Sequence, residues 1–378
     1  MIIRRTTMLP RRRPSSMLAV LAGVIGLTSF LPVLGSTAGA GTTTTELGVN
    51  VLMYPEFGTR QQNLDAAKKM FTYVRSLHAN AVALCFNVYP IVTSPDQTAV
   101  TTSTVGPGEA TPSPAFLGEV ADLAHAAGLT VQLRPLLNEA ALKSPSIASW
   151  RGAIAPADPA AWFASYTRTL TPFMRIARLH SVEGFVVGAE LTSMVKHNRY
   201  WLPLINLARR LTGTAVSYEG NWNPRESLPG ANFGLEFYQP IKSIFDLSQA
   251  TVANFTAGME ANLSSTNFGA LPVPLSQVTL SEVAVGARDR GWLQPWQASP
   301  SDAIVRSVQA NWFTAACNAV RDLGLKGIYF WSLLLNSSFS PTHSDDPVGG
   351  VGGDGGDGYH WQNTASSDAI SSCFSSLS

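Results

Sequence analysis

Short apolar runs alternate with longer segments whose apolar residues recur at helical spacing along most of the chain. The apolar runs predict strands over Leu47–Pro55, Ala81–Pro90, Leu129–Leu137, Val182–Leu191, Thr214–Trp222, Ala231–Pro240, Val278–Val285 and Lys326–Leu335. The helical spacing predicts helices over Asn63–His78, Ser113–Ala127, Asp158–His180, Tyr200–Leu211, Ser248–Leu263, Ser301–Leu323 and Thr364–Leu377. This alternation is typical of a parallel sheet that is covered by helices.

Eight strand–helix pairs in one chain predict an α/β fold, a single-domain (β/α)₈ TIM barrel. The alternative is a doubly wound open sheet. We favour the barrel because no glycine-rich phosphate loop follows any strand and because each strand is expected to be followed by a helix. No linker divides the chain, so we expect one domain.

The first forty residues differ from the rest. Met1–Ala40 contains five arginines and no acidic residue, then an apolar run over residues 17–34 and a closing Ala38-Gly39-Ala40. This is the pattern of an export signal that is cleaved at a small-x-small site. We therefore expect a secreted protein that begins at Gly41, with one folded domain over residues 41–378.

Loss of this leader changes the charge. Five of the 26 basic residues leave with it, so 21 remain against 25 acidic residues and the net charge becomes −4. Without a basic excess, a nucleic-acid partner is not expected. No later stretch is apolar for long enough to cross a membrane, and we expect a soluble monomer.

Three cysteines allow at most one disulfide. Cys85 lies in a strand-like apolar run, so the predicted pair is Cys317–Cys373.

Two glutamates close predicted strands. Glu190 follows the apolar run VVGA, and Glu282 lies within VTLSEVAV. A carboxylate there is costly unless it faces a cleft or a charged partner. Barrel active sites lie at the carboxyl ends of the strands, and we expect the fourth and seventh strands to lie across the barrel from one another, with the two carboxyls facing over its mouth. Facing carboxyls are the groups that cleave glycosidic bonds; the alternative is that each forms a structural ion pair with an arginine.

Aromatic residues gather at the same end of the predicted barrel. They lie at strand ends or in the loops after the last two strands: Trp222, Tyr238, Trp331, Trp292, Trp296 and Trp361. Such rings stack on the apolar faces of sugars, although any one of them can equally be packing.

Polar residues end strands as well, namely Tyr54, Asn87, Tyr89, Arg134, Asn138, Glu219 and Asn221. We expect Tyr54 and Asn221 to contact a substrate, and a turn-forming role is the alternative for Asn221. Arg134 is expected in the binding cleft, where it either orients a carboxylate or forms a structural ion pair.

Motifs of other chemistries do not occur in the sequence. There is no G-x-S-x-G, H-E-x-x-H or C-x-x-C, and the six histidines are scattered. We therefore expect no metal and no cofactor at the active site. The acidic glycine-rich segment Asp345–Gly358 has two interpretations, calcium binding through Asp354 and Asp357 or a mobile loop beside the site.

The succession VALCFNVY, ADLAHAAGLTVQLRP, SWRG, GFVVGAEL, YEGNW, LEFYQP, LSEVAVG and GIYFW resembles glycoside hydrolase family 113, the retaining endo-β-1,4-mannanases of a large (β/α)₈ clan. The resemblance covers roughly residues 47–331. It implies that Glu190 is the acid/base and Glu282 the nucleophile.

The same resemblance implies that Tyr238 lies near the nucleophile and that Trp331 forms the floor of the subsite for the cleaved sugar. Asn221 and Trp222 match the Asn-Trp that ends the fifth strand. Relatives in the wider clan carry Asn before the acid, where this chain has Ala189. The segments Val92–Pro114 and Asp345–Gly358 have no counterpart in the family pattern.

The sequence thus predicts a secreted glycoside hydrolase that cleaves a β-linked polysaccharide, first of all β-1,4-mannan, with retention. Trp296 and Arg134 are included among its substrate-binding residues, and the pKa of Glu190 is expected to be raised by the neighbouring Glu282. Three alternatives remain: a hydrolase of another β-glycan (glucan, xylan or galactan), a non-catalytic carbohydrate-binding barrel, and a cell-wall scaffold.

Overall fold

The computed structural model describes residues 45–55, 58–91, 99–102, 110–138, 150–222, 224–265, 273–297, 301–342 and 359–378. These residues all belong to one compact unit, Thr43–Ser378. The predicted leader Met1–Ala40 and the segment Asp345–Gly358 lie outside the described residues. Leader cleavage and calcium binding therefore stay predictions.

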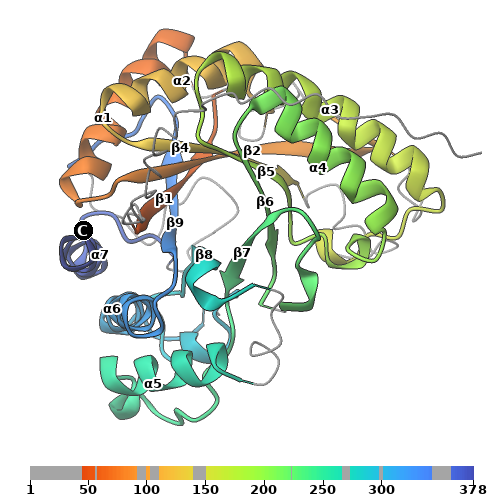
Figure 1. Ribbon diagram of the computed structural model, residues 1–378. Helices are drawn as coiled ribbons and strands as arrows, with labels where there is room; N and C mark the ends of the chain where they lie inside the picture. The colour runs from red at the N-terminus through yellow and green to blue at the C-terminus, as the bar shows by residue number, and fades with distance from the viewer. Residues whose placement is uncertain are drawn as a thin grey trace, which may run out of the picture. The chain divides into compact units, whose positions relative to one another are not determined.

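Eight parallel strands form a closed barrel (Figure 1), which confirms the predicted fold class. The strands are β1 (Glu46–Met53), β2 (Ala81–Ile91), β4 (Thr130–Leu137), β5 (Gly184–Ala189), β6 (Ala215–Gly220), β7 (Asn232–Phe237), β8 (Thr279–Val283) and β9 (Gly327–Leu335). Each pairs with the strand before and after it, and β1 closes the ring because it pairs with both β2 and β9.

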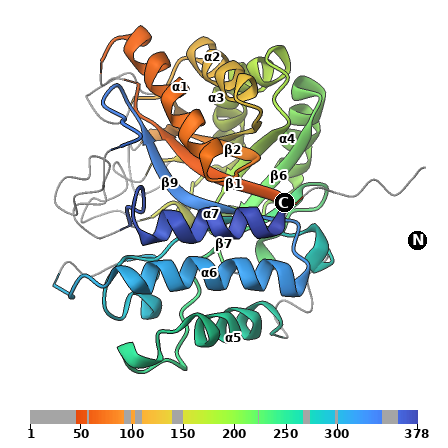
Figure 2. The ribbon, with the colours of Figure 1, turned by 90° about the vertical axis from the view of Figure 1, so that its left-hand side faces the viewer.

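Seven α-helices surround the barrel in the described part of the chain. They are α1 (Arg60–Ser76), α2 (Pro114–Ala126), α3 (Pro159–Leu179), α4 (Asn198–Thr212), α5 (Val252–Leu263), α6 (Arg306–Leu323) and α7 (Ala365–Leu377). Figure 2 shows α5, α6 and α7 side by side along one flank, where α6 packs against both neighbours.

The expectation of eight strand–helix pairs is wrong at one position. Between β6 and β7 the described residues form only the short 3-10 helix Pro224–Glu226. This connection spans 221–231 and contains Gly230 with a φ of 83°, a left-handed conformation that stops a helix. It is too short for an α-helix together with the loops that would lead into and out of it.

A ninth strand, β3 (Ala99–Thr101), pairs antiparallel with the end of β2. No strand was predicted from the sequence in this region. Val100 is buried; its N–H donates to Ser165 Oγ at 2.8 Å, and its carbonyl accepts from Thr169 Oγ1 at 2.9 Å. Because these partners lie on α3, tertiary contacts rather than local pattern fix this strand.

The predicted disulfide is confirmed. Cys317 on α6 bonds Cys373 on α7, with a Cα–Cα distance of 5.8 Å, while Cys85 is a buried free thiol. The bridge closes a loop with a sequence separation of 56, for which chain entropy alone gives about 4 kcal/mol of stabilisation. Within the described residues, no helix has both the length and the apolar character that crossing a membrane requires.

Candidate active site

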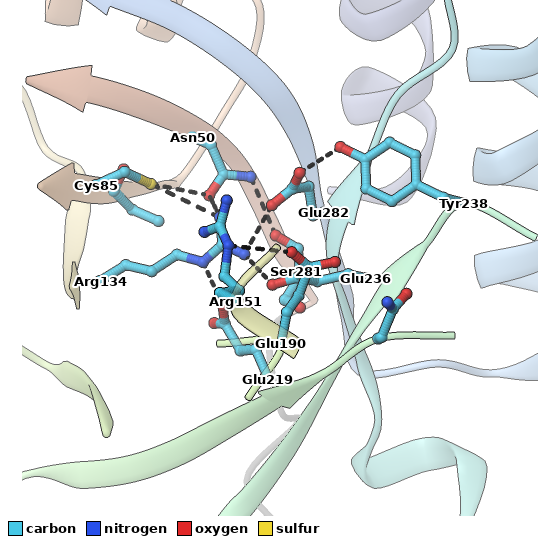
Figure 3. A network of polar contacts seen from close by, with 12 residues as sticks. Asn50, Cys85, Arg134, Arg151, Glu190, Glu219, Glu236, Tyr238, Ser281 and Glu282 are labelled. Carbon is cyan, nitrogen blue, oxygen red and sulfur yellow. Dashed lines mark hydrogen bonds and ion pairs between the residues drawn. The ribbon is translucent and has the colours of Figure 1, made fainter. Parts of the chain in front are cut away.

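Neighbouring strands place a layer of charged side chains at the carboxyl end of the barrel (Figure 3). Glu219 lies on β6, Glu236 on β7 and Glu282 on β8, and Glu236 pairs in register with Glu282. Arg134, on β4, reaches all three carboxyls. Because the strands are parallel and adjacent, residues far apart in sequence meet in one cluster.

Arg134 is the anchor of this cluster. Its Nε donates to Glu219, and its Nη2 donates to Glu236 and, at 2.7 Å, to Oε2 of Glu282. On its other side, Nη1 lies 3.3 Å from Oδ1 of Asn50, and the guanidinium carbon lies 5.6 Å from the ring centroid of Trp331. A guanidinium makes several such contacts at once because its donors are fixed in one plane.

The expectation that Arg134 binds substrate is therefore wrong, because its side chain is 0% exposed and lies beneath the cleft. Both roles that the sequence allowed are present, because Arg134 forms buried ion pairs with Glu219 and Glu236 and also orients a carboxylate nearer the cleft. The carboxylate so oriented is that of Glu282.

Glu282 is held at both oxygens. Oε2 accepts from Arg134, and Oε1 accepts from the hydroxyl of Tyr238, which follows β7. The preceding residue is fixed as well, since Asn50 Nδ2 donates to the Ser281 carbonyl at 3.0 Å. Donors on both oxygens fix the direction of the carboxyl group.

Glu190 follows the last residue of β5 and has a φ of 53°, the left-handed conformation that non-glycine residues rarely adopt. Its N–H donates to the Glu219 carbonyl at 2.8 Å. Its Oε2 lies 3.6 Å from Nε of Arg151, which belongs to the short helix Arg151–Ala153. An unusual backbone angle held by such bonds is common at functional sites.

Glu190 and Glu282 are not diametrically opposed. Their strands β5 and β8 are three positions apart, with β6 and β7 between them. The side chains of Glu190 and Glu282 are 16% and 10% exposed, whereas Glu219 and Glu236 are each 1% exposed. Two carboxyls thus reach the mouth and two lie below it. Each upper carboxyl contacts an arginine, as the ion-pair interpretation predicts, and the catalytic roles of Glu190 and Glu282 stay a prediction.

Burial changes the proton affinity of the lower carboxyls. The pKa of Glu219 is raised to about 7, mainly by burial and in part by the charges of Glu282 and Glu190, although Arg134 lowers it. Burial also raises the pKa of Glu236 well above its usual range, with further contributions from the charges of Glu190 and Glu282 and from a hydrogen bond to Glu190. Glu219 and Glu236 therefore hold a proton more readily near neutral pH than an exposed glutamate does.

Aromatic residues line the space beside the cluster. Trp222, after β6, stacks on Trp296 with ring centroids 5.2 Å apart and an interplanar angle of 28°. The two rings border a pocket of about 620 Å³ whose other walls include Gln239, Lys242 and Asn262. Trp296 is 44% exposed, so its ring is accessible from solvent.

Other predicted site residues lie deeper. Trp331 and Tyr54 belong to one apolar cluster, in which Tyr54 is 6% exposed. The side chain of Asn221 makes a local contact, because its Oδ1 accepts from the Trp222 N–H at 2.8 Å. Contact of Tyr54 or Asn221 with a substrate stays a prediction.

Trp292 and Trp361 are core residues, not platforms at the mouth. Their exposed fractions are 0% and 1%. The indole N–H of Trp292 donates to the Ile244 carbonyl at 3.0 Å, and that of Trp361 donates to the Trp331 carbonyl at 2.9 Å. Loop position in the sequence did not reveal that these rings turn inward.

Three residues of the site, Glu236, Arg151 and Asn50, were not predicted from the sequence. Glu236 could have been found by the rule that identified Glu190, since it is a carboxyl inside the apolar strand LEFYQP. Asn50 lies likewise inside an apolar strand. Arg151 follows no strand, and only the fold brings it to Glu190. Among the described residues, no group of three or more His, Cys, Asp and Glu side chains is placed to hold a metal ion.

A (β/α)₈ barrel with two accessible glutamates at the carboxyl ends of β5 and β8 is the architecture of a glycoside hydrolase. The sequence pattern of Glycoside Hydrolase Family 113 matches residues 56–342, and the chain belongs to that family. The predicted family and the predicted enzyme class are thereby confirmed.

Solved structures that are named as β-mannanases have a similar fold. A GH113 β-1,4-mannanase is 16% identical, with 88% of this chain and 99% of that chain covered and a TM-score of 0.68. The GH113 β-mannanase AaManA from Alicyclobacillus acidocaldarius, in complex with ManMIm, is 20% identical, with coverage of 89% and 98% and a TM-score of 0.65. An endo-β-1,4-mannanase from Thermotoga petrophila is 10% identical, with coverage of 89% and 77% and a TM-score of 0.56. A search of curated proteins found no match.

The raised pKa of Glu219 predicts a pH-dependent stability. An unfolded glutamate releases its proton near 4.5, whereas folded Glu219 keeps it up to about 7, so between these values the native state binds more protons and the free energy of unfolding falls as pH rises. The difference corresponds to on the order of 3 kcal/mol. Glu219→Gln cannot ionise yet keeps an oxygen for Arg134.

We expect the fall in the unfolding free energy between pH 4.5 and 7 to be smaller in Glu219→Gln than in the wild type. Urea unfolding at a series of pH values measures it, and the two proteins should differ least at the acidic end. Equal slopes across this window would contradict the assignment.

Proposed function

We propose that the protein is a retaining endo-β-1,4-mannanase. The observation that carries the proposal is the division of the four carboxyls, in which only Glu282 and Glu190 reach the mouth. Glu282 is oriented by Arg134 and Tyr238, while Glu190 lies beside Arg151. One fixed carboxylate and one separate carboxyl are the two groups that double displacement needs.

In the first step, an oxygen of Glu282 attacks the anomeric carbon while Glu190 gives its proton to the glycosidic oxygen, so that the bond to the leaving sugar breaks and a glycosyl ester forms. In the second step, Glu190 takes a proton from water, the water oxygen attacks the same carbon and the ester bond to Glu282 breaks. Retention by this route requires the two carboxyls to be about 5–5.5 Å apart.

Donors on Glu282 support its role as the nucleophile. Arg134 and Tyr238 occupy one oxygen each, which limits the rotation of the carboxyl group and keeps it in position for attack. The hydroxyl of Tyr238 stays neutral, because burial and the charge of Glu282 raise its pKa well above the usual range. It therefore remains a hydrogen-bond donor throughout the pH range in which glycosidases work.

The choice of mannan rests on the family and on similar structures that are named as mannanases. The pocket beside Trp222 and Trp296 is large enough for further sugar units beyond the cleaved bond, and its wall contains both rings and polar groups. Rings flanked by amides and hydroxyls are typical of carbohydrate sites. This favours a polymer over a small glycoside.

We also propose that the enzyme acts outside the cytoplasm. The leader pattern of Met1–Ala40 supports export. An independent observation is the Cys317–Cys373 disulfide, because such bridges persist mainly in oxidising compartments.

If the protein is a β-1,4-mannanase, we expect it to release reducing sugar from β-1,4-mannan in preference to glucan, xylan and galactan. Glu282→Ala should lower kcat on mannan about a thousandfold or more while the protein still binds mannan, because the nucleophile is lost and the pocket is kept. Glu46→Ala is the matched control: Glu46 begins β1 at the opposite end of the barrel, where it pairs with Lys326.

Reducing-sugar assays and affinity electrophoresis measure the two properties. Binding of mannan by a wild-type protein that releases no sugar from any of the four polymers would favour a non-catalytic barrel. A clear preference for another polymer would replace the substrate while leaving the mechanism intact.

Export predicts that protein recovered from the culture medium begins at Gly41. The intact mass should equal that of residues 41–378 less two hydrogens for the disulfide. A protein that stays in the cytoplasm with residues 1–40 attached would contradict the proposal.

A further inference from the structure

Glu236 is linked to both proposed catalytic glutamates, to Glu282 through Arg134 and to Glu190 directly. It lies on β7 between the strands that carry Glu282 and Glu219, and it is 1% exposed. Its carboxyl accepts from Nη2 of Arg134, the same nitrogen that binds Glu282 (Figure 3). A hydrogen bond between Glu236 and Glu190 contributes to the raised pKa of Glu236. No step of the mechanism described above uses it.

A hydrogen bond between two carboxyls needs a proton, because ionised carboxylates only accept. Glu190 is 16% exposed and has Arg151 beside it, so it has water and a cation to stabilise a charge. Glu236 lies deeper and shares Arg134 with two other carboxyls. The proton between the two therefore belongs on Glu236 whenever Glu190 is ionised.

The charges of the cluster lead to the same assignment. Four carboxyls face two guanidinium groups, so full ionisation would leave two uncompensated negative charges in a largely buried site. A neutral Glu236 removes one of them without breaking the contact with Arg134, which needs only an acceptor oxygen.

We propose that Glu236 is a neutral positioning residue that donates a hydrogen bond to Glu190 and stabilises the negative charge that Glu190 acquires when it protonates the leaving group. The inference rests on the proposed function, because it assigns Glu190 as the acid/base. During glycosylation the proton of Glu190 passes to the glycosidic oxygen, and the proton of Glu236 stays on Glu236. Because the new charge exists only after this transfer begins, the hydrogen bond is strongest in the transition state and product.

Several ionisable groups surround Glu236, from every strand packed near it. They are Arg134 on β4, Glu190 after β5, Tyr218 and Glu219 on β6, Tyr238 after β7 and Glu282 on β8. Burial raises the pKa of both tyrosine hydroxyls well above the usual range, so they carry no charge. Glu219 is the comparison residue, since it shares Arg134 and burial but meets Glu190 through its backbone carbonyl.

The kinetic test compares Glu236→Ala, Glu236→Gln and Glu219→Gln on two aryl β-mannosides, one with a poor and one with a good leaving group. Glu236→Ala should lose about 10- to 100-fold in kcat/KM on the poor leaving group, the range for one hydrogen bond to a charged group. It should lose little on the good one, which needs no acid. Glu236→Gln keeps an N–H donor and should stay within a few-fold of wild type.

Any loss in Glu219→Gln should be equal on the two substrates. Equal losses on both substrates in Glu236→Ala, or a Glu236→Gln enzyme as impaired as Glu236→Ala, would overturn the proposal. Circular dichroism and the melting temperature show whether each variant is folded.

An infrared measurement tests the proton itself and does not depend on activity. Burial raises the pKa of Glu226 to about 7, as it does that of Glu219. At a pH about two units higher, where both are largely ionised, the wild type should keep the carbonyl band of a neutral carboxylic acid. The band should vanish in Glu236→Gln and persist in Glu219→Gln. Its absence from the wild type, or its persistence in Glu236→Gln, would overturn the proposal even if the protein cleaves no mannan.

Discussion

One buried guanidinium holds the active site together. Arg134 is completely enclosed and binds three carboxyls that come from three successive strands. Without this cation, those carboxyls would repel one another inside a region of low polarizability, and the cost of burying them would be several kcal/mol per ion. The position of Glu282 in the cleft depends on it, since the same nitrogen that binds Glu236 binds Glu282.

The four carboxyls of the cluster lie at two depths, and the exposure of each corresponds to its proposed role. Glu219 and Glu236 lie at the bottom, where burial raises their pKa values and favours neutral forms. Glu282 and Glu190 lie higher, and each has an arginine beside it. In the proposed mechanism, the same residue type therefore serves as a reactant or as a neutral support according to its exposure, as in other enzymes that separate the functions of paired carboxyls.

Much of the fold was predictable because barrel strands are buried on both faces and therefore read as continuous apolar runs. All eight barrel strands, the disulfide and the location of Glu190 and Glu282 followed from such runs. The missing helix between β6 and β7 and the extra strand β3 did not, because a short connection and contacts with α3 decide them.

The site was harder to predict than the fold. A polar residue at a strand end is visible in the sequence, but its depth is not, so Arg134 was expected in the cleft although it lies below it. Trp292 and Trp361 follow strands in the sequence yet turn into the core. Arg151 comes from a segment with no strand pattern and reaches Glu190 only in three dimensions.

In the proposed mechanism, the carboxylate held by Arg134 and Tyr238 is the group that attacks the sugar. Inactivation with a 2-fluoro mannosyl fluoride, followed by mass spectrometry of peptides, identifies the residue that carries the trapped ester. We expect one label per molecule, on Glu282. A label on Glu190, Glu219 or Glu236, or turnover without any covalent intermediate, would contradict it.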